Sequence, residues 1–496
     1  SVSNLSDLLP SGGGSKSAKF VASGTLPNGQ AVILNANGTV TAVAETSTTT
    51  PESIPAGAAS VFESSSTSEL SMAFDPNSAN KFVVAYRDDI NSSYAAAIVG
   101  TVSGTSISFG TAVVFESVSS SWMLIAFDPN NANKFVVAYR ATSGYGRAIV
   151  GTVSGTSLSF GTAVVFESSS TVYISMNFDP NNANKFVVAY RGTSNYGKAI
   201  VGTVSGTSIS FGTAVVFESA DTGYISMAFD ASNANKFVVA YSDAGNSDYG
   251  TAVVGTVSGT SLSFGTAVVF ENAQSIYISM DFDPNNANKF VVVYRDGGNA
   301  NYGTAIIGTV SGTSISFGSA VLFSSADTGY MSMDFDPNNA NKFVVAYQNT
   351  TNSSYGTAVV GTVSGTSLSF GSASVFESAS TTFISTAFDP TNAGQFVVAY
   401  RGTSGYGTAI VGQIEVTVST TNLTTTNFVG IPDKAYAASA TATVVAKGGV
   451  SLNQTSLTIG TTYYVQGNGT LGTSAGTPSV EAGRAISATS ILLKGK

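Results

Sequence analysis

One segment recurs seven times between Phe74 and Gly412, and a Phe-Asp pair marks the same place in each copy. The pairs are Phe74-Asp75, Phe127-Asp128, Phe178-Asp179, Phe229-Asp230, Phe282-Asp283, Phe335-Asp336 and Phe388-Asp389. Successive pairs are 53, 51, 51, 53, 53 and 53 residues apart. A nearly constant period of this length predicts a repeat architecture, in which each repeat packs mainly against its neighbours.

Each copy is predicted to form four short strands, as the fifth copy illustrates. Apolar and polar residues alternate in 277–282, and the β-rich segments 289–294, 302–310 and 314–323 follow it, separated by Asn, Gly and Ser turns. Gly318 lies inside the last segment and predicts a bulge or a close backbone approach. Four antiparallel strands in about fifty residues are typical of one blade of a β-propeller.

A count of strands predicts how the array ends. The first three strands occur seven times, the last set at 383–412, but the fourth strand follows only the first six sets. Before the first repeat, residues 59–63 match residues 373–377. We therefore expect the N-terminal segment to supply the missing strand and close a seven-bladed ring over residues 54–412, because closure hides the edge strands.

The flanks, residues 1–50 and 413–496, are not repeats. Leu5–Lys16 is rich in Gly and Ser and is expected to be flexible. The rest predicts short strands around Asn-Gly turns, with 45–50 and 419–426 as connectors to the propeller. Ring closure would bring the two flanks together, so we expect one small discontinuous β domain with the propeller inserted into it.

Composition excludes several classes of function. The formal net charge is −9 and the pI about 4.6, which argues against a nucleic-acid partner. No apolar run is long enough for a membrane-spanning helix, so no membrane insertion is expected. The chain has no Cys and no His, which removes disulfides, thiolate chemistry and the commonest general base and metal ligand. We expect no catalytic residue, no metal site and no cofactor.

Several segments carry a resemblance to a known class of protein. In the flanks these are 22–40, 427–431, 463–471, 480–489 and 492–495; in the repeats they are Phe-Asp-Pro-Asn, Lys-Phe-Val-Val-Ala-Tyr-Arg and the sequence of 202–212. Together they resemble virion structural and fibre-type proteins of marine tailed phages. The resemblance implies a protein on the virion surface, extracellular after release, whose flanking β domain contacts other virion proteins. This class of protein is defined by its architecture rather than by an active site, so the resemblance implies no catalytic residue. Fibre proteins are often trimers, but no heptad repeat supports a trimer here.

The two predicted rims of the propeller differ in variability. The first-to-second and third-to-fourth strand turns barely change between copies, whereas the second-to-third strand loop varies in sequence and length. Binding residues concentrate on variable loops of a rigid scaffold, so we place ligand contact, with a host glycan or protein, on the variable rim. The candidates are Arg87, Arg140, Arg191, Arg295, Arg401, Trp122, Tyr173, Tyr224, Tyr277 and Tyr330. The alternative is that these arginines are solvated and the aromatics only pack between blades.

Three classes of function are compatible with the sequence. The favoured one is a non-enzymatic tail-fibre or appendage protein whose propeller attaches to the host surface or its glycans. The second is a capsid decoration or fibre component without receptor binding. The third is a polysaccharide hydrolase that uses Asp281 and Asp334, which the strand pattern points toward the axis. The repeated Asp of the Asp-Pro-Asn turns suggests either an Asx turn or a calcium ligand.

Overall fold

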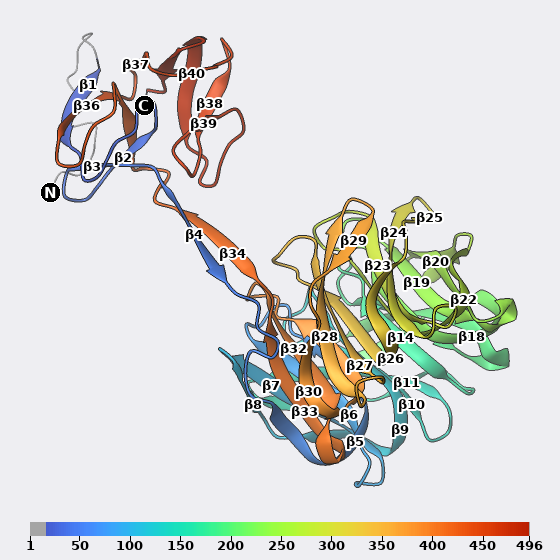
Figure 1. The fold of residues 1–496 in the computed structure, drawn as a ribbon. Helices are drawn as coiled ribbons and strands as arrows, with labels where there is room; N and C mark the ends of the chain where they lie inside the picture. Colours follow the sequence, from blue (N-terminus) through green and yellow to red (C-terminus); the bar gives the residue numbers. More distant parts are fainter. Residues whose placement is uncertain (1–15, 496) are drawn as a thin grey trace. The chain divides into compact units, whose positions relative to one another are not determined.

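The computed structural model describes residues 16–495, which form two compact bodies (Figure 1). The repeat body is Pro51–Val416, and the flanking body joins Ser1–Thr50 to Thr417–Lys496. The segment expected to be flexible, 5–16, lies outside the described residues up to Ser15. Apart from strands there are only short 3-10 helices, among them η2 (Thr193–Asn195), η3 (Ala244–Asn246) and η4 (Thr403–Gly405), so no helix within residues 16–495 could cross a membrane.

The repeat body consists of seven antiparallel repeats, numbered 1 to 7 from the repeat that contains Phe74 to the one that contains Phe388. The second strands are β6 (Lys81–Asp88), β10 (Lys134–Ala141), β15 (Lys185–Arg191), β19 (Lys236–Asp243), β23 (Lys289–Asp296), β27 (Lys342–Asn349) and β32 (Gln395–Arg401). The third strands are β7 (Tyr94–Ser103), β11 (Gly146–Ser154), β16 (Tyr196–Ser205), β20 (Tyr249–Ser258), β24 (Tyr302–Ser311), β28 (Tyr355–Ser364) and β33 (Tyr406–Gln413).

The predicted fourth strand differs from expectation, because it is divided in two. Its first half is a short strand that turns back on the third strand: β8 (Ser106–Phe109), β12 (Ser157–Phe160), β17 (Ser208–Phe211), β21 (Ser261–Phe264), β25 (Ser314–Phe317) and β29 (Ser367–Phe370). Its second half runs on into the first strand of the next repeat. The resulting continuous strands are β5 (Ser60–Phe74), β9 (Val113–Phe127), β18 (Val215–Phe229), β22 (Val268–Phe282) and β26 (Val321–Phe335). In two repeats the strand is interrupted and forms a pair of shorter strands: β13 (Val164–Glu167) with β14 (Val172–Phe178), and β30 (Ser374–Ser380) with β31 (Thr382–Phe388).

A glycine separates the two halves of the fourth strand because the next repeat comes very close there. A Cβ on Gly318 would lie 2.5 Å from the carbonyl oxygen of Thr366, in the tight turn of the following repeat. At Gly265 the corresponding distance, to the carbonyl oxygen of Thr313, would be 2.1 Å. The close backbone approach predicted at Gly318 is therefore confirmed.

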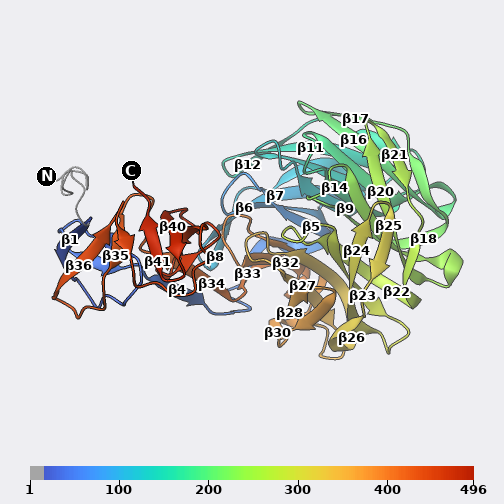
Figure 2. The ribbon, with the colours of Figure 1, turned by 90° about the horizontal axis from the view of Figure 1, so that it is seen from above.

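The first and last repeats contact each other in the same way as consecutive ones. Strand β5 pairs with β33, with Val61 opposite Thr408, so residues 60–63 take the place predicted for them. The Gln395 side-chain amide donates to the carbonyl oxygen of Gly104 at 2.9 Å, just as Lys81 donates to Gly155 at 2.8 Å. Figure 2 shows the repeats following one another around a common centre, with the blue β5 beside the orange β33. Ser53 also pairs with Gln413, which is why the repeat body extends to 51–416 rather than the predicted 54–412.

Serine side chains join the innermost strands. The first strand is the inner edge of each repeat and leaves backbone N–H groups unpaired on that side. A serine Oγ of one repeat accepts a hydrogen bond from such an N–H of the next at 3.0–3.2 Å; the acceptors are Ser71, Ser175, Ser226, Ser279, Ser332 and Ser385. Ser385 in repeat 7 accepts from Met72 in repeat 1. Repeat 2 has Leu124 at this position and lacks the bond.

Removing one of these acceptors should destabilise the repeat body. In Ser279→Ala the Met333 N–H loses its partner at a part-buried position, which costs about 1–3 kcal/mol of unfolding free energy. Urea unfolding followed by circular dichroism measures the change. Leu124→Ala at the same position in repeat 2 breaks no such bond, so its effect reports packing alone and serves as the comparison.

The flanking body contains two five-stranded sheets that share one apolar core. The first sheet is β1 (Ser17–Val21), β36 (Thr441–Ala446), β35 (Phe428–Pro432), β2 (Val32–Leu34) and β3 (Val40–Ala42). The second is β37 (Val450–Ser451), β41 (Ser490–Leu493), β40 (Glu481–Ser487), β38 (Thr462–Val465) and β39 (Leu471–Gly472). The first predicted connector, 45–50, is β4 (Glu45–Thr50), which pairs as a two-stranded ribbon with β34 (Val416–Thr421), where Ser47 bonds Ser419 and Thr49 bonds Thr417. The second predicted connector, 419–426, overlaps this ribbon only at 419–421, and its Leu423 lies in the core of the flanking body.

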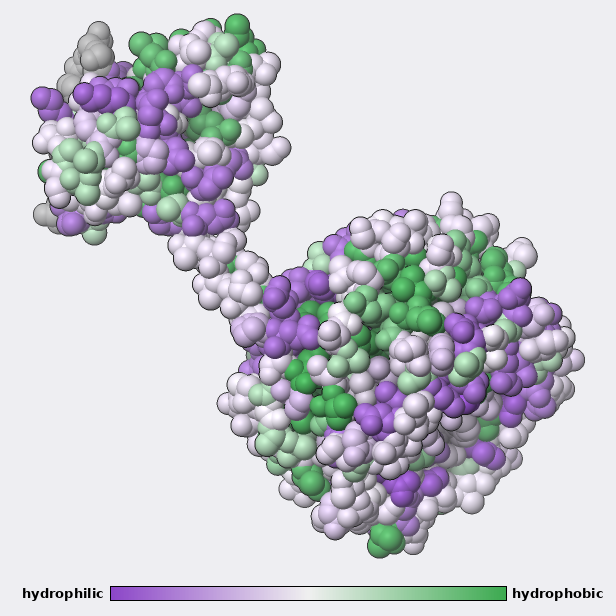
Figure 3. All heavy atoms as spheres, viewed as in Figure 1, coloured by the Kyte–Doolittle hydropathy of each residue, from purple (hydrophilic) through white to green (hydrophobic). Residues whose placement is uncertain are grey.

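Apolar residues reach the surface of the repeat body, where they appear green in Figure 3. The exposed aliphatic residues include one at the same position of every repeat, on the outer half-strand that nothing covers: Val61, Val114, Val165, Val216, Val269, Leu322 and Val375. Such isolated exposed side chains are ordinary for a folded surface and define no patch by themselves.

Candidate binding site in the central cup

A β-bulge at the same place in every repeat shapes the centre of the repeat body. In repeat 5, Ile276 lies opposite Arg295 and Ser279 opposite Val293, so Tyr277 and Ile278 face the single residue Tyr294. The same two-against-one register occurs in the other six repeats. A bulge turns a side chain away from the regular alternation of the strand and bends the strand locally.

The first bulge residue has a left-handed backbone in all seven repeats, with φ between 44° and 54°. These residues are Glu69, Trp122, Tyr173, Tyr224, Tyr277, Tyr330 and Phe383, and we call them together the central cup. A positive φ is unfavourable for bulky side chains, at about 1–3 kcal/mol each, and such strain clusters at binding sites. The strained conformation recurs because the bulge imposes it, and it places one large side chain per repeat at the centre.

Six of the seven cup positions are aromatic, and their rings contact one another in sequence. Centroids of neighbouring rings lie 4.5 Å apart for Trp122 and Tyr173, and 5.1–5.4 Å apart along the series from Tyr173 to Phe383. The planes of neighbouring rings are tilted by 41–59°. Tilted contacts of this kind are favourable between aromatic rings, so the rings hold each other in place.

The cup encloses a cavity of about 230 Å³, lined by the cup residues and by the aliphatic or Met residue after each. Glu69 brings the single carboxylate into this lining, and it accepts a hydrogen bond from the Trp122 N–H at 2.8 Å. Burial raises the pKa of Glu69, and the Trp122 hydrogen bond and the charges of Arg87 and Arg140 oppose that rise. The cavity therefore combines aromatic walls with one polar, partly desolvated acid.

The tyrosine hydroxyls of the cup are available to a ligand. The tyrosine hydroxyls that form hydrogen bonds within residues 16–495 belong to other residues, namely Tyr86, Tyr139, Tyr190, Tyr241, Tyr294, Tyr347, Tyr400, Tyr436 and Tyr463. Burial, together with the neighbouring Tyr173 and Tyr277, raises the pKa of Tyr224 to about 12. Phenol groups that raise each other's pKa lie close together, so their hydrogen-bond donors and acceptors lie within one small volume.

The five candidate arginines surround the cup rather than line its cavity. Arg87 pairs with Asp89 at 2.7 Å, Arg191 with Asp221 at 2.8 Å and Arg295 with Asp327 at 2.9 Å. The Arg191 guanidinium also lies 5.0 Å from the centroid of Tyr173. Arg140 forms no ion pair within the described residues.

The fifth arginine, Arg401, lines a separate cavity of about 440 Å³ with the Gly402–Gly405 loop and the 379–382 segment. Its guanidinium donates to Ser66 at 3.3 Å. The five predicted aromatics thus form one cluster, whereas the predicted arginines are distributed around it and three of them already have carboxylate partners.

Two cup residues, Phe383 and Glu69, were missed in the sequence. The prediction included the aromatic residue at the start of the first strand in repeats 2 to 6 only, the last of them Tyr330. An alignment of the seven repeats would have identified both, because Phe383 and Glu69 occupy the position equivalent to Tyr277. Glu69 is not aromatic, so only its equivalent position in the aligned repeats identifies it as a cup residue.

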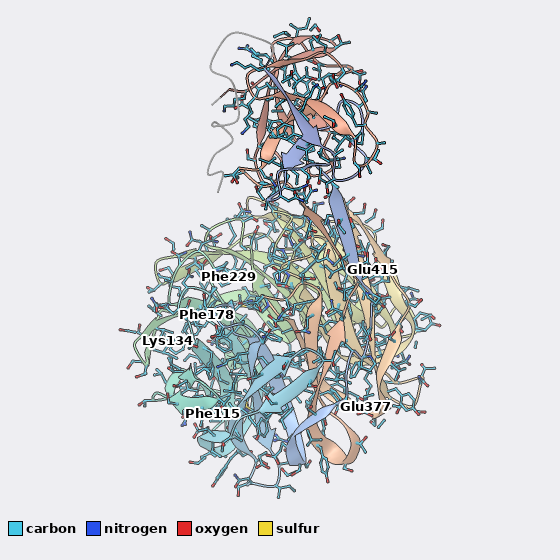
Figure 4. All side chains as sticks on the ribbon, turned by 90° about the vertical axis from the view of Figure 1, so that its left-hand side faces the viewer. Phe115, Lys134, Phe178, Phe229, Glu377 and Glu415 are labelled. Carbon is cyan, nitrogen blue, oxygen red and sulfur yellow. The ribbon has the colours of Figure 1, made fainter. Side chains whose placement is uncertain are left out.

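The opposite end of the inner strands has a different chemistry. A cavity of about 290 Å³ there is lined by phenylalanines and prolines, including Phe178 and Phe229, which Figure 4 labels on neighbouring repeats. Asp281 and Asp334 also line it, as predicted from the strand pattern. Both residues are half-buried, and the backbone N–H groups of Phe335 and Phe388 donate to their carboxyls at 3.3 Å and 2.6 Å.

The Asp281 and Asp334 carboxyls are close enough to hydrogen-bond to each other. Burial raises the pKa of Asp281 to about 6; burial and the charge of Asp281 raise that of Asp334 as well. Glycosidase carboxyls flank the scissile bond at roughly 5–9.5 Å, whereas these two carboxyls interact with each other.

The Asp residues of the Asp-Pro-Asn turns are buried and hydrogen-bonded. Asp75 Oδ1 accepts from the Asn77 N–H at 2.9 Å, and its Oδ2 accepts from the Asn133 N–H of the next repeat at 3.2 Å. The first bond is an Asx turn, the structural use predicted from the sequence. The second shows that the same carboxylate also links neighbouring repeats.

No protein-family model matches the chain, and comparison with the sequences of characterised proteins gives no match. Among solved structures, the BP39L lectin from Burkholderia pseudomallei is similar, with a TM-score of 0.54 at 10% identity over 77% of this chain and 99% of that one. Sqt1 from Saccharomyces cerevisiae (TM-score 0.45, 11% identity, 73% and 99% covered) and AofleA from Arthrobotrys oligospora (0.40, 7%, 80% and 98%) are more distant. The chain is thus an all-β repeat protein with a fold like that of the BP39L lectin.

Proposed function

We propose that the repeat body is a closed seven-bladed β-propeller that binds glycans through its variable rim. Closure is supported by the β5–β33 pairing and by the Ser385–Met72 and Gln395–Gly104 bonds, which repeat between repeats 7 and 1 the contacts made elsewhere. It is also supported by the cup cavity, to which the first strand of each repeat contributes.

Glycan binding rests mainly on one observation, the strained cup at the centre of the rim. Aromatic faces pack against the C–H faces of a sugar ring, while phenol hydroxyls and a carboxylate bond its hydroxyl groups. The fold likeness to a protein that is itself a lectin agrees with this proposal. The five rim arginines then provide secondary contacts outside the cup.

The test is binding of the full chain to a glycan array. Tyr277→Ala removes one wall of the cup and should weaken binding of any retained glycan by about tenfold or more, as expected for the loss of a central aromatic contact. Tyr145→Ala is the matched control, because Tyr145 is 37% exposed and does not line the cup. If no glycan on the array binds, glycan recognition is excluded and a purely structural role takes its place. If a glycan binds and both variants bind it alike, recognition by the cup is excluded.

We further propose that the protein is a virion surface component, a tail fibre or similar appendage, whose flanking body contacts other virion proteins while the propeller attaches to the host. The resemblance of the flanks and repeats to marine phage virion proteins supports this placement. Immunogold electron microscopy of particles with an antibody to the repeat body tests it. Unlabelled particles would exclude a virion location without bearing on glycan binding.

A further inference from the structure

One cup position breaks the aromatic series, and its chemistry points to the kind of ligand. Six repeats place an aromatic ring at the bulge, whereas repeat 1 places Glu69 there with the same backbone, φ 54°. We propose that the central cup selects a positively charged nitrogen, so that the glycan it binds carries an ammonium group, either as a free amino sugar or as a choline-type substituent. This inference rests on the proposed glycan binding and names its ligand class.

The aromatic walls favour a cation. An ammonium group within about 6 Å of a ring centroid is attracted by the negative face of the ring, with Trp the most favourable ring. The cup itself shows the interaction, because Arg191 lies 5.0 Å from the centroid of Tyr173. The cup contains the sole tryptophan of the chain, Trp122, next to Glu69 in the series.

Glu69 supplies the matching negative charge. It forms no ion pair within the described residues, and Arg87, one of the two arginines whose charge acts on it, is bonded to Asp89 at 2.7 Å. The other is Arg140 of the next repeat, which lies outside the cavity lining. The Trp122 N–H bonds one carboxylate oxygen, Oε2. A partly desolvated carboxylate without a close cation is unfavourable, and an ammonium ligand would relieve that cost.

A neutral sugar would use the aromatic walls equally well, but it would not require a carboxylate where six repeats carry a ring. The cavity of about 230 Å³ is small beside ligand pockets of roughly 300–1,000 Å³, and it suits one terminal sugar or one trimethylammonium group.

Trp122 provides a direct measurement, because its fluorescence in the full chain reports the cup alone. Two pairs of probes test the charge: oligomers of glucosamine against oligomers of N-acetylglucosamine, which also differ by the acetyl group, and choline against its neutral tert-butyl analogue, which has the same shape. We expect the charged member of at least one pair to change the fluorescence with a dissociation constant at least about tenfold below that of its neutral partner. The first pair identifies an amino sugar and the second a choline-type group.

Glu69→Gln isolates the carboxylate, because Gln keeps an oxygen to accept the Trp122 N–H. It should weaken binding of the charged probe by about tenfold while leaving a neutral probe unchanged. Asp248→Asn removes one negative charge from the same rim outside the cavity and should have little effect.

If glycans bind but the charged and neutral probes bind alike, or if Glu69→Gln binds the charged probe as the wild type does, the cationic inference is overturned and the proposed glycan binding stands. If no array glycan and neither charged probe binds, both are overturned.

Discussion

Replacing Phe62 by alanine should lower the free energy of unfolding of the repeat body by about 3–5 kcal/mol, although Phe62 lies in a segment that precedes the first repeat. Its side chain is 8% exposed. It packs 5.3 Å from the Tyr86 ring of repeat 1 and so close to repeat 7 that a Cβ on Gly407 would meet it at 2.4 Å. The cost is large because the substitution leaves a cavity between the two ends of the array.

The repeats provide a matched comparison for this prediction. Phe376 occupies the same position inside the continuous array: it is 6% exposed, lies 5.2 Å from Tyr400 and would meet a Cβ on Gly356 at 2.5 Å. In a closed ring, Phe62→Ala and Phe376→Ala should lower the thermal unfolding midpoint by similar amounts. Val61→Ala, at a side chain that is 51% exposed, should change it little. A normal midpoint for Phe62→Ala beside a reduced one for Phe376→Ala would mean that the array is open.

Asp281→Asn should stabilise the protein at neutral pH and have no such effect in acid. Asp281 and Asp334 share a cavity in which burial raises the pKa of both, that of Asp281 to about 6. The folded state therefore favours the protonated pair. Its contribution to stability is complete below the unfolded pKa of about 3.9 and is lost as the pH rises through the folded value. Asparagine stays neutral at every pH and can donate a hydrogen bond to Asp334, so the variant does not lose stability as the pH rises. Repeat 3 already has Asn177 at this position.

The quantity to measure is the difference in unfolding free energy between Asp281→Asn and wild type at each pH, because other carboxylates titrate in both proteins. We expect a gain on the order of 1–2 kcal/mol at pH 8 that disappears near pH 4. Asp221→Asn, whose side chain on the rim is 45% exposed, should show no gain that grows with pH. A difference for Asp281→Asn that is constant across this range would show that the pair does not share a proton.

The local structure of the repeats follows closely from their sequence. Alternation over 277–282 and the β-rich segments 289–294 and 302–310 correspond to the end of β22, to β23 and to β24. The prediction departed from the structure at 314–323, where a single strand was expected. Gly318 divides that segment, and its second half continues into the next repeat, because the closely approaching turn at Thr366 leaves no room for a straight strand.

The candidate site was only partly predictable. Trp122 and the four rim tyrosines were identified as a group, but regular spacing of aromatic residues favours blade packing over binding as their explanation. Strand alternation has a period of two, and a one-residue bulge breaks it without leaving a mark in the sequence. The left-handed φ of Tyr277 and the position of Glu69 in the central cup follow from that bulge.

The sequence by itself determined the period, the strand content, the absence of His and Cys chemistry, and the segment that pairs with the last repeat. The first three follow from composition and from which residues alternate and which form turns, and the fourth follows from comparison of the copies with one another. Only the tertiary structure decided which side chains meet across repeats: the serine bonds between inner strands, the proximity of Asp281 to Asp334, and the place of Glu69 beside the six aromatic residues of the cup. Contacts between residues some fifty positions apart depend on how whole repeats pack around a common centre, and no local pattern in the chain encodes them.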